Sequence, residues 1–481
     1  MNVLFVASEV VPFVKTGGLA DVIGSLPNAL IEQGAAVRVI LPKYEDIPDR
    51  YKDQMVTLHI LEVQLGYRTQ YCGIQELKID GLHYYFIDNE FYFRRKGIYG
   101  YGDDAERFVF FCRAVMEALP LLDFKPDILH SHDWQSGLIP FLLQTQYYTH
   151  PFYQQMGTVF TIHNLKYKGQ FSRDLLKDLL SIGDEHFTND RLEFFGDGSC
   201  LKAGIVYADK ITTVSQTYAA EIQTYEYGEH LDGLLRHRNQ DLSGIVNGID
   251  NLVYNPMTDP HITVQYRNAM TKKRKNKLKL QADLGLTVDE RIPMFGLVSR
   301  LVQQKGLDLV EQALEEMLQM DLQLVVLGTG DYAYEHMFQH AAYRFPQKVS
   351  AHISFYEPFA RRIYASSDIF LMPSLFEPCG LGQLIALRYR TVPLVRETGG
   401  LKDTVQSFNE YTGKGNGFSF THYFASDMLH TIRRAVEFYK DEETWSRIIQ
   451  NISKVEFGWE QSAMKYLSLY EKIRQQKAIH P

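Results

Sequence analysis

The sequence has few cysteines and no long apolar run, and each shortage excludes a class of protein. Its four cysteines are scattered over 481 residues, with neither a disulfide framework nor paired metal-ligand spacing. No uninterrupted apolar stretch is long enough to cross a bilayer, so we expect no membrane partner. The N-terminus enters a strand-like run almost at once, without the basic segment and apolar core of a signal peptide. We therefore expect a cytoplasmic protein.

The sequence also lacks an excess of positive charge, with 50 basic against 58 acidic residues. The formal net charge is −8, and the sequence pI is about 6.1, which argues against a general polyanion binder and against a nucleic-acid partner. One basic run, 272–279, stands out as a possible polyanion patch. The leucines Leu280, Leu284 and Leu286 follow it. We interpret the run instead as the solvated face of a helix that opens a second domain.

Short apolar runs alternate with helical patterns almost throughout the chain, which is typical of parallel sheets covered by helices. The predicted strands are 3–7, 36–41, 127–130, 158–162, 210–214, 293–298, 322–327, 369–372 and 392–395. Residues 20–30 have the spacing of a helix. The segment 51–88 alternates differently and indicates antiparallel strands in, or beside, the first sheet.

A chain of this length is too long for one hydrophobic core and predicts two large domains. We place the first at 1–245 and the second at 246–458, because a turn-rich stretch follows residues 244–250 and the pattern then starts again. An amphipathic helix from about Trp459, within 459–481, is expected to return to the first domain. The fold class is thus α/β, with two Rossmann-like domains facing a deep cleft.

The segment Lys15-Thr16-Gly17-Gly18-Leu19 lies between the first predicted strand and the first predicted helix. Glycines let a backbone approach a ligand closely, and a helix N-terminus offers free N–H groups and a positive dipole end. With a lysine beside it, this segment is a candidate anion-binding turn. It is also compatible with an ordinary strand-to-helix turn that carries a surface lysine.

Polar clusters follow two further predicted strands, as expected for ligand-binding residues in such sheets. His130-Ser131-His132-Asp133-Trp134 follows one strand, and Thr161-Ile162-His163-Asn164 follows the next. Asp133, His163 and Asn164 suit sugar hydroxyls as donors or acceptors. Metal binding by the histidines is disfavoured, because no carboxylate or cysteine partner stands at ligand spacing.

The second half has its own candidate site. Arg300 and Lys305 lie where a loop leads into a predicted helix, and their positive charges suit a diphosphate. They are also compatible with ordinary charged residues on the surface. Glu377-Pro378-Cys379-Gly380-Leu381 follows a later strand, and the amides of 380–382 are a possible second anion cradle. We interpret Cys379 as a packed, inert cysteine, since no histidine is near it in sequence. The segment 398–405 is a further turn of this kind.

Taken together, these segments resemble the bacterial glycogen synthases and plant starch synthases. Those enzymes are retaining glucosyltransferases of the two-Rossmann-domain type called GT-B. The matching motifs run in family order over essentially the whole chain. They are 15–21, 131–134, 161–165, 246–250, 299–301 with 304–306, 377–381 with 383–384, and 398–401 with 403–405.

The resemblance implies transfer of glucose from ADP-glucose to the non-reducing end of an α-1,4-glucan such as glycogen, with retention and without a metal or other cofactor. The residues implied as catalytic are His163, Arg300, Lys305 and Glu377. Those implied in donor binding are Lys15, Gly17, Gly18, Asp21, Asn247, Tyr356, Cys379, Gly380 and Leu381. Asp133 and Asn164 are implied on the acceptor and sugar side, and Tyr356 matches a position that stacks on adenine.

Two positions depart from common patterns among such enzymes: Gln135 stands where His is common, and Gly382 stands where Thr is frequent. Ile385 stands where many other retaining transferases have a second acid, as the resemblance to glycogen synthases implies. We expect Gln135 to alter hydrogen bonding behind the site. The alternative function is a GT-B transferase that uses UDP-glucose or a small acceptor. A glucan-binding protein without catalysis is disfavoured, because all of the implied catalytic residues and Lys15 are present.

Overall fold

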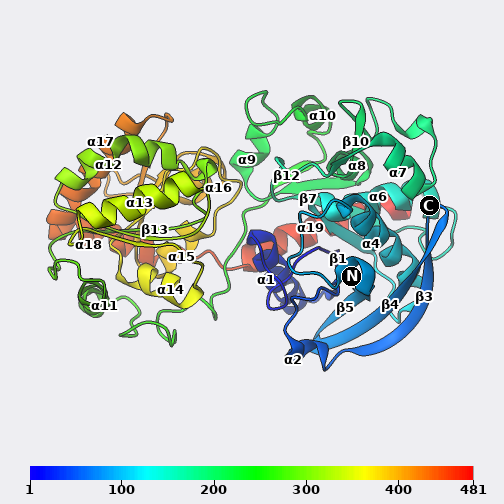
Figure 1. Ribbon diagram of the computed structural model, residues 1–481, viewed down its shortest axis with the longest axis horizontal. Helices are drawn as coiled ribbons and strands as arrows, with labels where there is room; N and C mark the ends of the chain where they lie inside the picture. The colour runs from blue at the N-terminus through cyan, green and yellow to red at the C-terminus, as the bar shows by residue number, and fades with distance from the viewer. Residues whose placement is uncertain (480–481) are drawn as a thin grey trace. The chain divides into compact units, whose positions relative to one another are not determined.

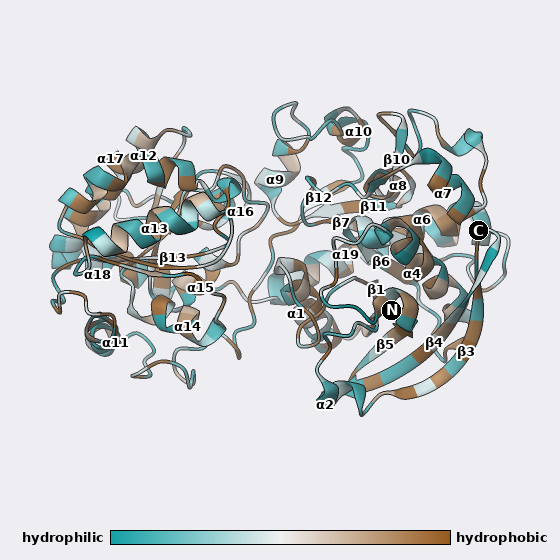
Figure 2. Cartoon of the chain, viewed as in Figure 1, coloured by the Kyte–Doolittle hydropathy of each residue, from teal (hydrophilic) through white to brown (hydrophobic). Residues whose placement is uncertain are grey.

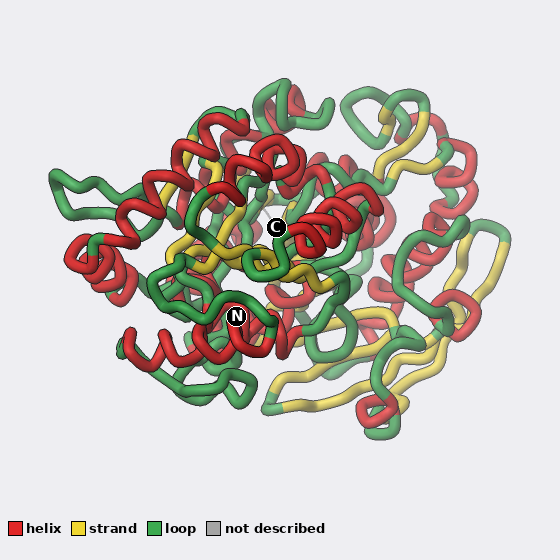
Figure 3. Tube along the Cα trace, turned by 60° about the vertical axis from the view of Figure 1, so that its left-hand side comes forward, coloured by secondary structure: helices red, strands yellow, loops and turns green. Residues whose placement is uncertain are grey.

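The computed structural model describes residues 1–479, and these form two compact units (Figure 1). Unit 1 comprises Met1–Asn247 together with the segment that starts at Trp459. Unit 2 comprises Gly248–Gly458. The chain leaves unit 1 at Asn247, within the stretch where the sequence pattern starts again. In both units, helices (red in Figure 3) flank the strands (yellow).

Within the described residues, unit 1 contains a nine-stranded sheet in the order β12-β11-β7-β6-β1-β2-β5-β4-β3. Its strands are β1 (Asn2–Val6), β2 (Ala36–Pro42), β3 (Val56–Leu65), β4 (Arg68–Ile79), β5 (Leu82–Asp88), β6 (Ile128–His132), β7 (Gly157–Ile162), β11 (Lys210–Thr213) and β12 (Leu242–Gly244). The strands β3 and β4 pair antiparallel at one edge, which confirms the expectation for residues 51–88. From β5 to β12, neighbouring strands are parallel.

Helices cover both faces of this sheet. They are α1 (Gly18–Glu32), α2 (Asp49–Lys52), α3 (Glu90–Phe93), α4 (Asp104–Ala118), α5 (Asp133–Ser136), α6 (Leu138–Leu142), α7 (Arg173–Leu180), α8 (Cys200–Tyr207), α9 (Gln216–Glu221), α10 (Asp232–His237) and α19 (Glu460–Ile479). A small sheet of β8 (Gln170–Phe171), β10 (Asp197–Ser199) and β9 (Glu193–Phe194) lies apart from the large one. On β7, Gly157 faces Ile473 of α19, whereas Phe160 on the opposite face meets Gly204 of α8. The helix α19 also packs against α1.

Unit 2 contains a six-stranded, wholly parallel sheet in the described range, in the order β15-β14-β13-β16-β17-β18. Its strands are β13 (Met294–Val298), β14 (Gln323–Leu327), β15 (Val349–His352), β16 (Ile369–Met372), β17 (Val392–Arg396) and β18 (Phe418–Phe420). Strands buried on both faces need nearly continuous apolar residues, which is why apolar runs in the sequence predict these strands. The sheet around β13 accordingly appears as a brown band in Figure 2.

Two helical layers enclose the sheet of unit 2 (Figure 1). One layer, whose buried residues join Phe295 and Leu297, contains α12 (Leu307–Gln319), α13 (Tyr332–Arg344), α17 (Ala425–Lys440) and α18 (Glu442–Ser453). The other, whose buried residues join Met294, contains α11 (Met270–Asp283), α14 (Glu357–Ser366) and α15 (Gly382–Arg388). The short helix α16 (Gly399–Thr404) follows β17.

Both large sheets have the strand order of the Rossmann fold. Counted along the chain, the parallel strands of unit 2 run 3-2-1-4-5-6 across the sheet, and those of unit 1 run the same way before β12 is added. The order reverses between β1 and β6 in unit 1, and between β13 and β16 in unit 2. Ligands of open parallel sheets bind outside the carboxyl ends of strands at such a reversal.

The basic run lies on α11, but its interpretation as a solvated face is wrong for two of its lysines. Lys273 and Lys277 are buried, one helical turn apart. Lys273 donates to the carbonyls of Tyr364 and Ala365, and burial lowers its pKa to about 7. Lys277 pairs with buried Asp368 at 2.6 Å. These two amines attach α11 to the rest of unit 2.

The structure adds two findings to the expectations from composition. Over residues 1–479, no helix combines the length and apolar character required to cross a bilayer. The four cysteines, all within the described residues, are buried, and no disulfide joins any two of them.

Candidate active site

The predicted residues of unit 1 follow the carboxyl ends of adjacent strands. Lys15, Gly17, Gly18 and Asp21 follow β1. Asp133 follows β6, and His163 and Asn164 follow β7. Because β1, β6 and β7 are neighbouring parallel strands, these residues gather at one edge of the sheet, beside the reversal of strand order. Asn247 follows β12 at the same edge, and its side-chain oxygen is buried without a partner among residues 1–479.

The segment 15–19 forms the turn into α1, which begins at Gly18. The ammonium of Lys15 lies 2.8 Å from the Asp21 carboxylate, and about a third of the Lys15 side chain is exposed. Lys15 is therefore held by a partly solvated ion pair in front of the first turn of a helix. That turn carries N–H groups with no partner inside the helix.

Glu9 contributes to this turn, and sequence reasoning missed it. Its buried carboxylate accepts hydrogen bonds from the amides of Thr16, at 2.5 Å, and Gly17, at 3.3 Å, and from the hydroxyl of Thr16. Burial raises the pKa of Glu9. Two amides of the expected anion turn are thus taken by the protein itself, so a ligand meets the amides from Gly18 onward. The available signal was a polar pair, Ser8-Glu9, directly after an apolar strand.

Asp133 connects the ends of β6 and β7. One of its carboxylate oxygens accepts from the backbone N–H of His163, at 2.8 Å, and of Asn164, at 3.4 Å. Asp133 adopts φ of 54°, a left-handed conformation that is uncommon for residues other than glycine. Desolvation raises its pKa to about 7. Asp133 thus fixes the backbone of His163 and Asn164, the two predicted residues after β7.

Three histidines form a continuous series under this edge, which we call the histidine file: His130, His132 and His163. The rings of His130 and His132 lie 4.2 Å apart, and Nδ1 of His132 is 3.1 Å from Nε2 of His163. His130 meets the hydroxyls of Tyr470 and Thr161 at 2.7 and 2.6 Å. A hydrogen bond thus joins His132 to His163, and ring packing joins His130 to His132.

The histidine file predicts acid sensitivity. Burial lowers the pKa of all three histidines below 6.5, that of His163 to about 3. Below pH 6.5 the unfolded chain takes up protons that the native state excludes. Stability present above pH 6.5 is therefore lost as pH falls, by at most about 1.4 kcal/mol per pH unit for each histidine. Replacing His132 with Asn should reduce the fall in Tm between pH 7 and pH 5.

This prediction is checked by measuring Tm at both pH values in the wild type and the variant. Asp133, with its raised pKa, acts with the opposite sign in both proteins, so comparing them isolates the histidine. The exposed histidine His59 provides the control, and His59→Asn should preserve the wild-type pH dependence. An unchanged fall in Tm for His132→Asn would contradict the prediction.

In unit 2, Lys305 and Glu377 form an ion pair at the reversal of strand order. The ammonium of Lys305, in the turn after β13, lies 2.6 Å from a carboxylate oxygen of Glu377, in the loop after β16. Ser374 donates to the same oxygen at 3.2 Å. The Glu377 side chain is only 8% exposed. Arg300, which precedes Lys305 in the same segment, is exposed. The pair has the fixed charges that a phosphorylated sugar would require.

Two glycines let these loops approach one another. Gly306 has φ of 73°, and a Cβ there would lie 1.9 Å from the carbonyl oxygen of Pro373. Gly399 has φ of 45°, and its Cβ would lie 1.9 Å from the carbonyl oxygen of Glu377. Only glycine fits at either position. The turn at 398–400 thereby supports the loop that carries Glu377, and the amide of Gly400 donates to the carbonyl of Glu377.

The remaining predicted residues of unit 2 occupy the same edge of its sheet. Cys379, Gly380 and Leu381 lie between β16 and α15, and Cys379 is buried. Tyr356 precedes α14 after β15, and its ring is exposed, as stacking on a ligand would require. At Gly382 a Cβ would lie 3.0 Å from the Phe370 ring, which gives a packing reason for glycine where threonine is frequent.

Gln135, the other departure, is buried in unit 1, and its side-chain oxygen has no partner among the described residues.

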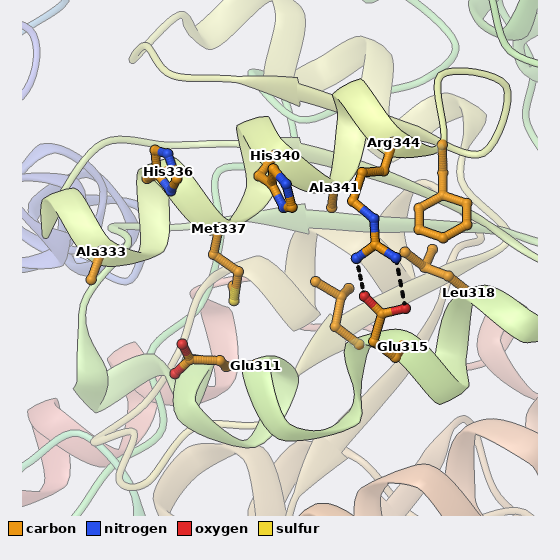
Figure 4. A pocket seen from close by; sticks show the side chains of 11 residues that line it. Glu311, Glu315, Leu318, Ala333, His336, Met337, His340, Ala341 and Arg344 are labelled. Carbon is orange, nitrogen blue, oxygen red and sulfur yellow. Dashed lines mark hydrogen bonds and ion pairs between the residues drawn. The ribbon is translucent and has the colours of Figure 1, made fainter.

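A cavity of ≈ 290 Å³ lies elsewhere, between α12 and α13 (Figure 4). It is lined by His336, His340 and Met337 of α13 and by Glu311 of α12, and Glu315 and Arg344 form an ion pair across it. None of the residues predicted from the sequence lines this cavity.

Family models match both units. Residues 2–237 match the model described as the starch synthase catalytic domain, and residues 285–455 match the model described as glycosyl transferases group 1.

Curated relatives and solved structures agree with these models. The chain is 57% identical to a glycogen synthase of Desulforamulus reducens over 98% of this chain and 99% of the relative. It is 53% identical to a glycogen synthase of Geobacillus thermodenitrificans over 98% of both chains. The catalytic domain of starch synthase IV from Arabidopsis thaliana, bound to ADP and acarbose, matches with a TM-score of 0.91 and 33% identity over 98% of this chain and 99% of that one. A sucrose-phosphate synthase from Thermosynechococcus elongatus, at 16% identity and a TM-score of 0.64 over 98% of both chains, shares the fold.

Two Rossmann-like units, each with charged and glycine-rich loops at its strand reversal, define a glycosyltransferase of the GT-B class. The identities of 52 to 57% to glycogen synthases, over 98% of the chain, indicate one particular family within this class. The chain belongs to the family of bacterial glycogen synthases and plant starch synthases, and it is a hexosyltransferase.

Proposed function

We propose that this hexosyltransferase is a glycogen synthase that transfers glucose from ADP-glucose to the non-reducing end of an α-1,4-glucan, with retention at the anomeric carbon. The observation that carries the proposal is the Lys305–Glu377 ion pair at the strand reversal of unit 2, in a chain 57% identical to a glycogen synthase. The bound ADP of the Arabidopsis relative supports a nucleoside diphosphate as the leaving group.

In the proposed reaction, the bond from the anomeric carbon to the β-phosphate oxygen of the donor breaks. A bond from the same carbon to the acceptor O4 forms. Negative charge then develops on ADP and positive charge on the sugar. We assign Arg300, Lys305 and Lys15 to the negative charge, together with the first amides of α1. Fixed charges stabilise a transition state strongly because they need no reorganisation during the reaction.

We assign Glu377 to the glucose hydroxyls and to the positive charge that develops on the sugar. The two contacts to one of its oxygens hold the carboxylate in place, so it is oriented before substrate arrives. Retaining glycosidases use two carboxylates on either side of the bond. Here Ile385 stands at the position of the second acid and is buried in the core of unit 2. We therefore propose a front-face reaction, in which the departing phosphate oxygen takes the proton of the acceptor hydroxyl.

On the sugar side we propose His163, Asn164 and Asp133, with His163 beside the transferred glucose. Burial holds the pKa of His163 at about 3, so at neutral pH its ring is an uncharged hydrogen-bonding group. The residues proposed to bind the donor are Gly17, Gly18, Asp21, Asn247, Tyr356, Cys379, Gly380 and Leu381. Because Glu9 takes the amide of Gly17, we propose that Gly17 acts by letting the backbone approach the donor closely. We also propose a cytoplasmic location, because the sequence has only four cysteines and they form no disulfide framework, as suits a reducing compartment.

The test is an assay of the purified protein with ADP-glucose and glycogen. We expect release of ADP with matching lengthening of glucan chains, and the new linkages should be α-1,4. UDP-glucose and small acceptors such as glucose are assayed in parallel. Turnover with ADP-glucose and glycogen well above every other pair supports the proposal. A clear preference for UDP-glucose, or for a small acceptor, would replace it with a related transferase activity.

A further inference from the structure

His132 lies between the core of unit 1 and His163. Its ring stacks on Phe5, with ring centroids 5.4 Å apart, and packs at a tilt against His130, with centroids 4.2 Å apart, and it has no exposed surface. Its backbone N–H donates to the hydroxyl of Ser136 at 2.7 Å, and that hydroxyl donates to the His132 carbonyl at 2.8 Å. The backbone of His132 is thus fixed by Ser136, and its imidazole is confined between Phe5 and His130.

The two ring nitrogens of His132 have unequal surroundings. Nδ1 lies 3.1 Å from Nε2 of His163, which is hydrogen-bond distance. Nε2 is buried and has no hydrogen-bond partner among the described residues. Since both rings are uncharged when buried, each carries one N–H and one lone pair. The contact between them therefore has one donor and one acceptor.

Only two arrangements of the protons satisfy this contact. In the first, Nδ1–H of His132 donates to Nε2 of His163, and the buried Nε2 of His132 keeps only a lone pair. In the second, Nε2–H of His163 donates to His132, which places an N–H on Nε2 of His132 with no acceptor. Orphaned N–H groups are rare in protein interiors, and an orphaned donor loses its full hydration. The first arrangement is the stable one.

We propose that His132 is a positioning residue for the transfer reaction. It donates Nδ1–H to Nε2 of His163 and thereby holds the proton of His163 on Nδ1. This inference rests on the proposed function for the role of His163, whereas the position of the proton follows from the contacts of two uncharged rings. His163 is partly exposed, so its Nδ1–H becomes a fixed, uncharged donor on the sugar side of the site. Neutral histidines with one dictated tautomer serve as electrophilic donors in other enzymes.

The series extends to the C-terminal helix. His130, which packs against His132, contacts the Tyr470 hydroxyl of α19 at 2.7 Å and the Thr161 hydroxyl at 2.6 Å. Both nitrogens of His130 thus have hydroxyl partners, which can donate or accept. His130 is equally buried but makes no hydrogen bond to His163, which makes it a matched control for disturbance of the core.

The test combines nitrogen NMR with kinetics. The 15N shifts of the two His163 ring nitrogens are measured in histidine-labelled protein and assigned by their loss in His163→Asn. We expect the Nδ1 resonance to be of the protonated type and Nε2 of the unprotonated type. His132→Leu removes the donor, so the proton of His163 should redistribute to Nε2. The kcat should fall about 10- to 100-fold, the range known for loss of the hydrogen-bond partner that orients a histidine in metal sites.

His132→Asn supplies the rescue, because its amide nitrogen can occupy the place of Nδ1 and donate to His163. It should restore the Nδ1–H form and most of kcat, while His130→Asn should leave the shifts of His163 unchanged. A protonated Nε2 on His163 in the wild type overturns the inference, and so does a normal kcat in His132→Leu. If ADP-glucose is not a donor, the proposed function fails, whereas the NMR result still decides where the proton lies.

Discussion

Replacing Glu377 with Gln should lower kcat for transfer from ADP-glucose about 10²- to 10³-fold, the loss typical of a preorganised charge or donor in a site. Gln has the shape of Glu and can still accept from Lys305 and Ser374, so the loop after β16 should keep its course. What disappears is the negative charge that we assign to the transition-state sugar. Because that charge acts where positive charge develops, the loss should fall on kcat more than on KM.

The measurement is a steady-state assay of ADP release over a range of ADP-glucose concentrations, with Tm recorded for each variant. The control is Glu315→Gln, which removes the carboxylate of the exposed Glu315–Arg344 ion pair in the same unit. That variant should keep kcat, since the pair lies on α12 and α13, at the cavity that holds none of the predicted residues. A kcat for Glu377→Gln close to the wild type, in a folded protein, would contradict the role assigned to Glu377.

The strands of this fold were predictable because parallel strands are buried on both faces. Residues 369–372 and 392–395 were expected as strands, and β16 and β17 lie there with one residue of difference at most. The same physics explains where the site residues stand, since polar residues that follow such runs must lie at the carboxyl edge of the sheet. The antiparallel edge was visible from its alternation, because exposed and buried residues alternate over 62–65 of β3, where the strand packs on the core.

Features that depend on the particular partner of a side chain were not predictable. Lys273 and Lys277 were expected in solvent, but carbonyls and Asp368 from other elements offer them partners in the core. Glu9 was overlooked, although only seven residues separate it from Thr16 in the sequence, because the turn that brings the two together is irregular. The bond between His132 and His163 joins two strand ends whose register no sequence pattern states. The spacing of apolar residues along the sequence predicts which side chains are buried. The hydrogen-bond partners of those side chains depend on how the strands and helices are connected in the fold.

Replacing Lys15 with Ala should leave the fold intact and lower kcat about 10²- to 10³-fold, the range for losing one fixed stabilising group in a site. The ion pair of Lys15 with Asp21 is partly solvated, with side-chain exposures of 33% and 22%. Pairs of this kind contribute about 0–1 kcal/mol to stability, so Tm should change little. We propose that the cost appears only when negative charge develops on the departing diphosphate in front of α1.

Two matched variants make this test specific. Lys52→Ala removes another ion-paired lysine of unit 1, 2.9 Å from Asp49, and should preserve both kcat and Tm. Lys15→Arg keeps the positive charge but changes its geometry, since a guanidinium is planar and an ammonium is a compact point charge. It should recover part of the lost kcat, because the charge rather than the exact contact does most of the stabilisation. Full activity in Lys15→Ala would show that the turn before α1 does not touch the reacting phosphate, and equal losses in Lys15→Ala and Lys52→Ala would reduce its effect to general surface charge.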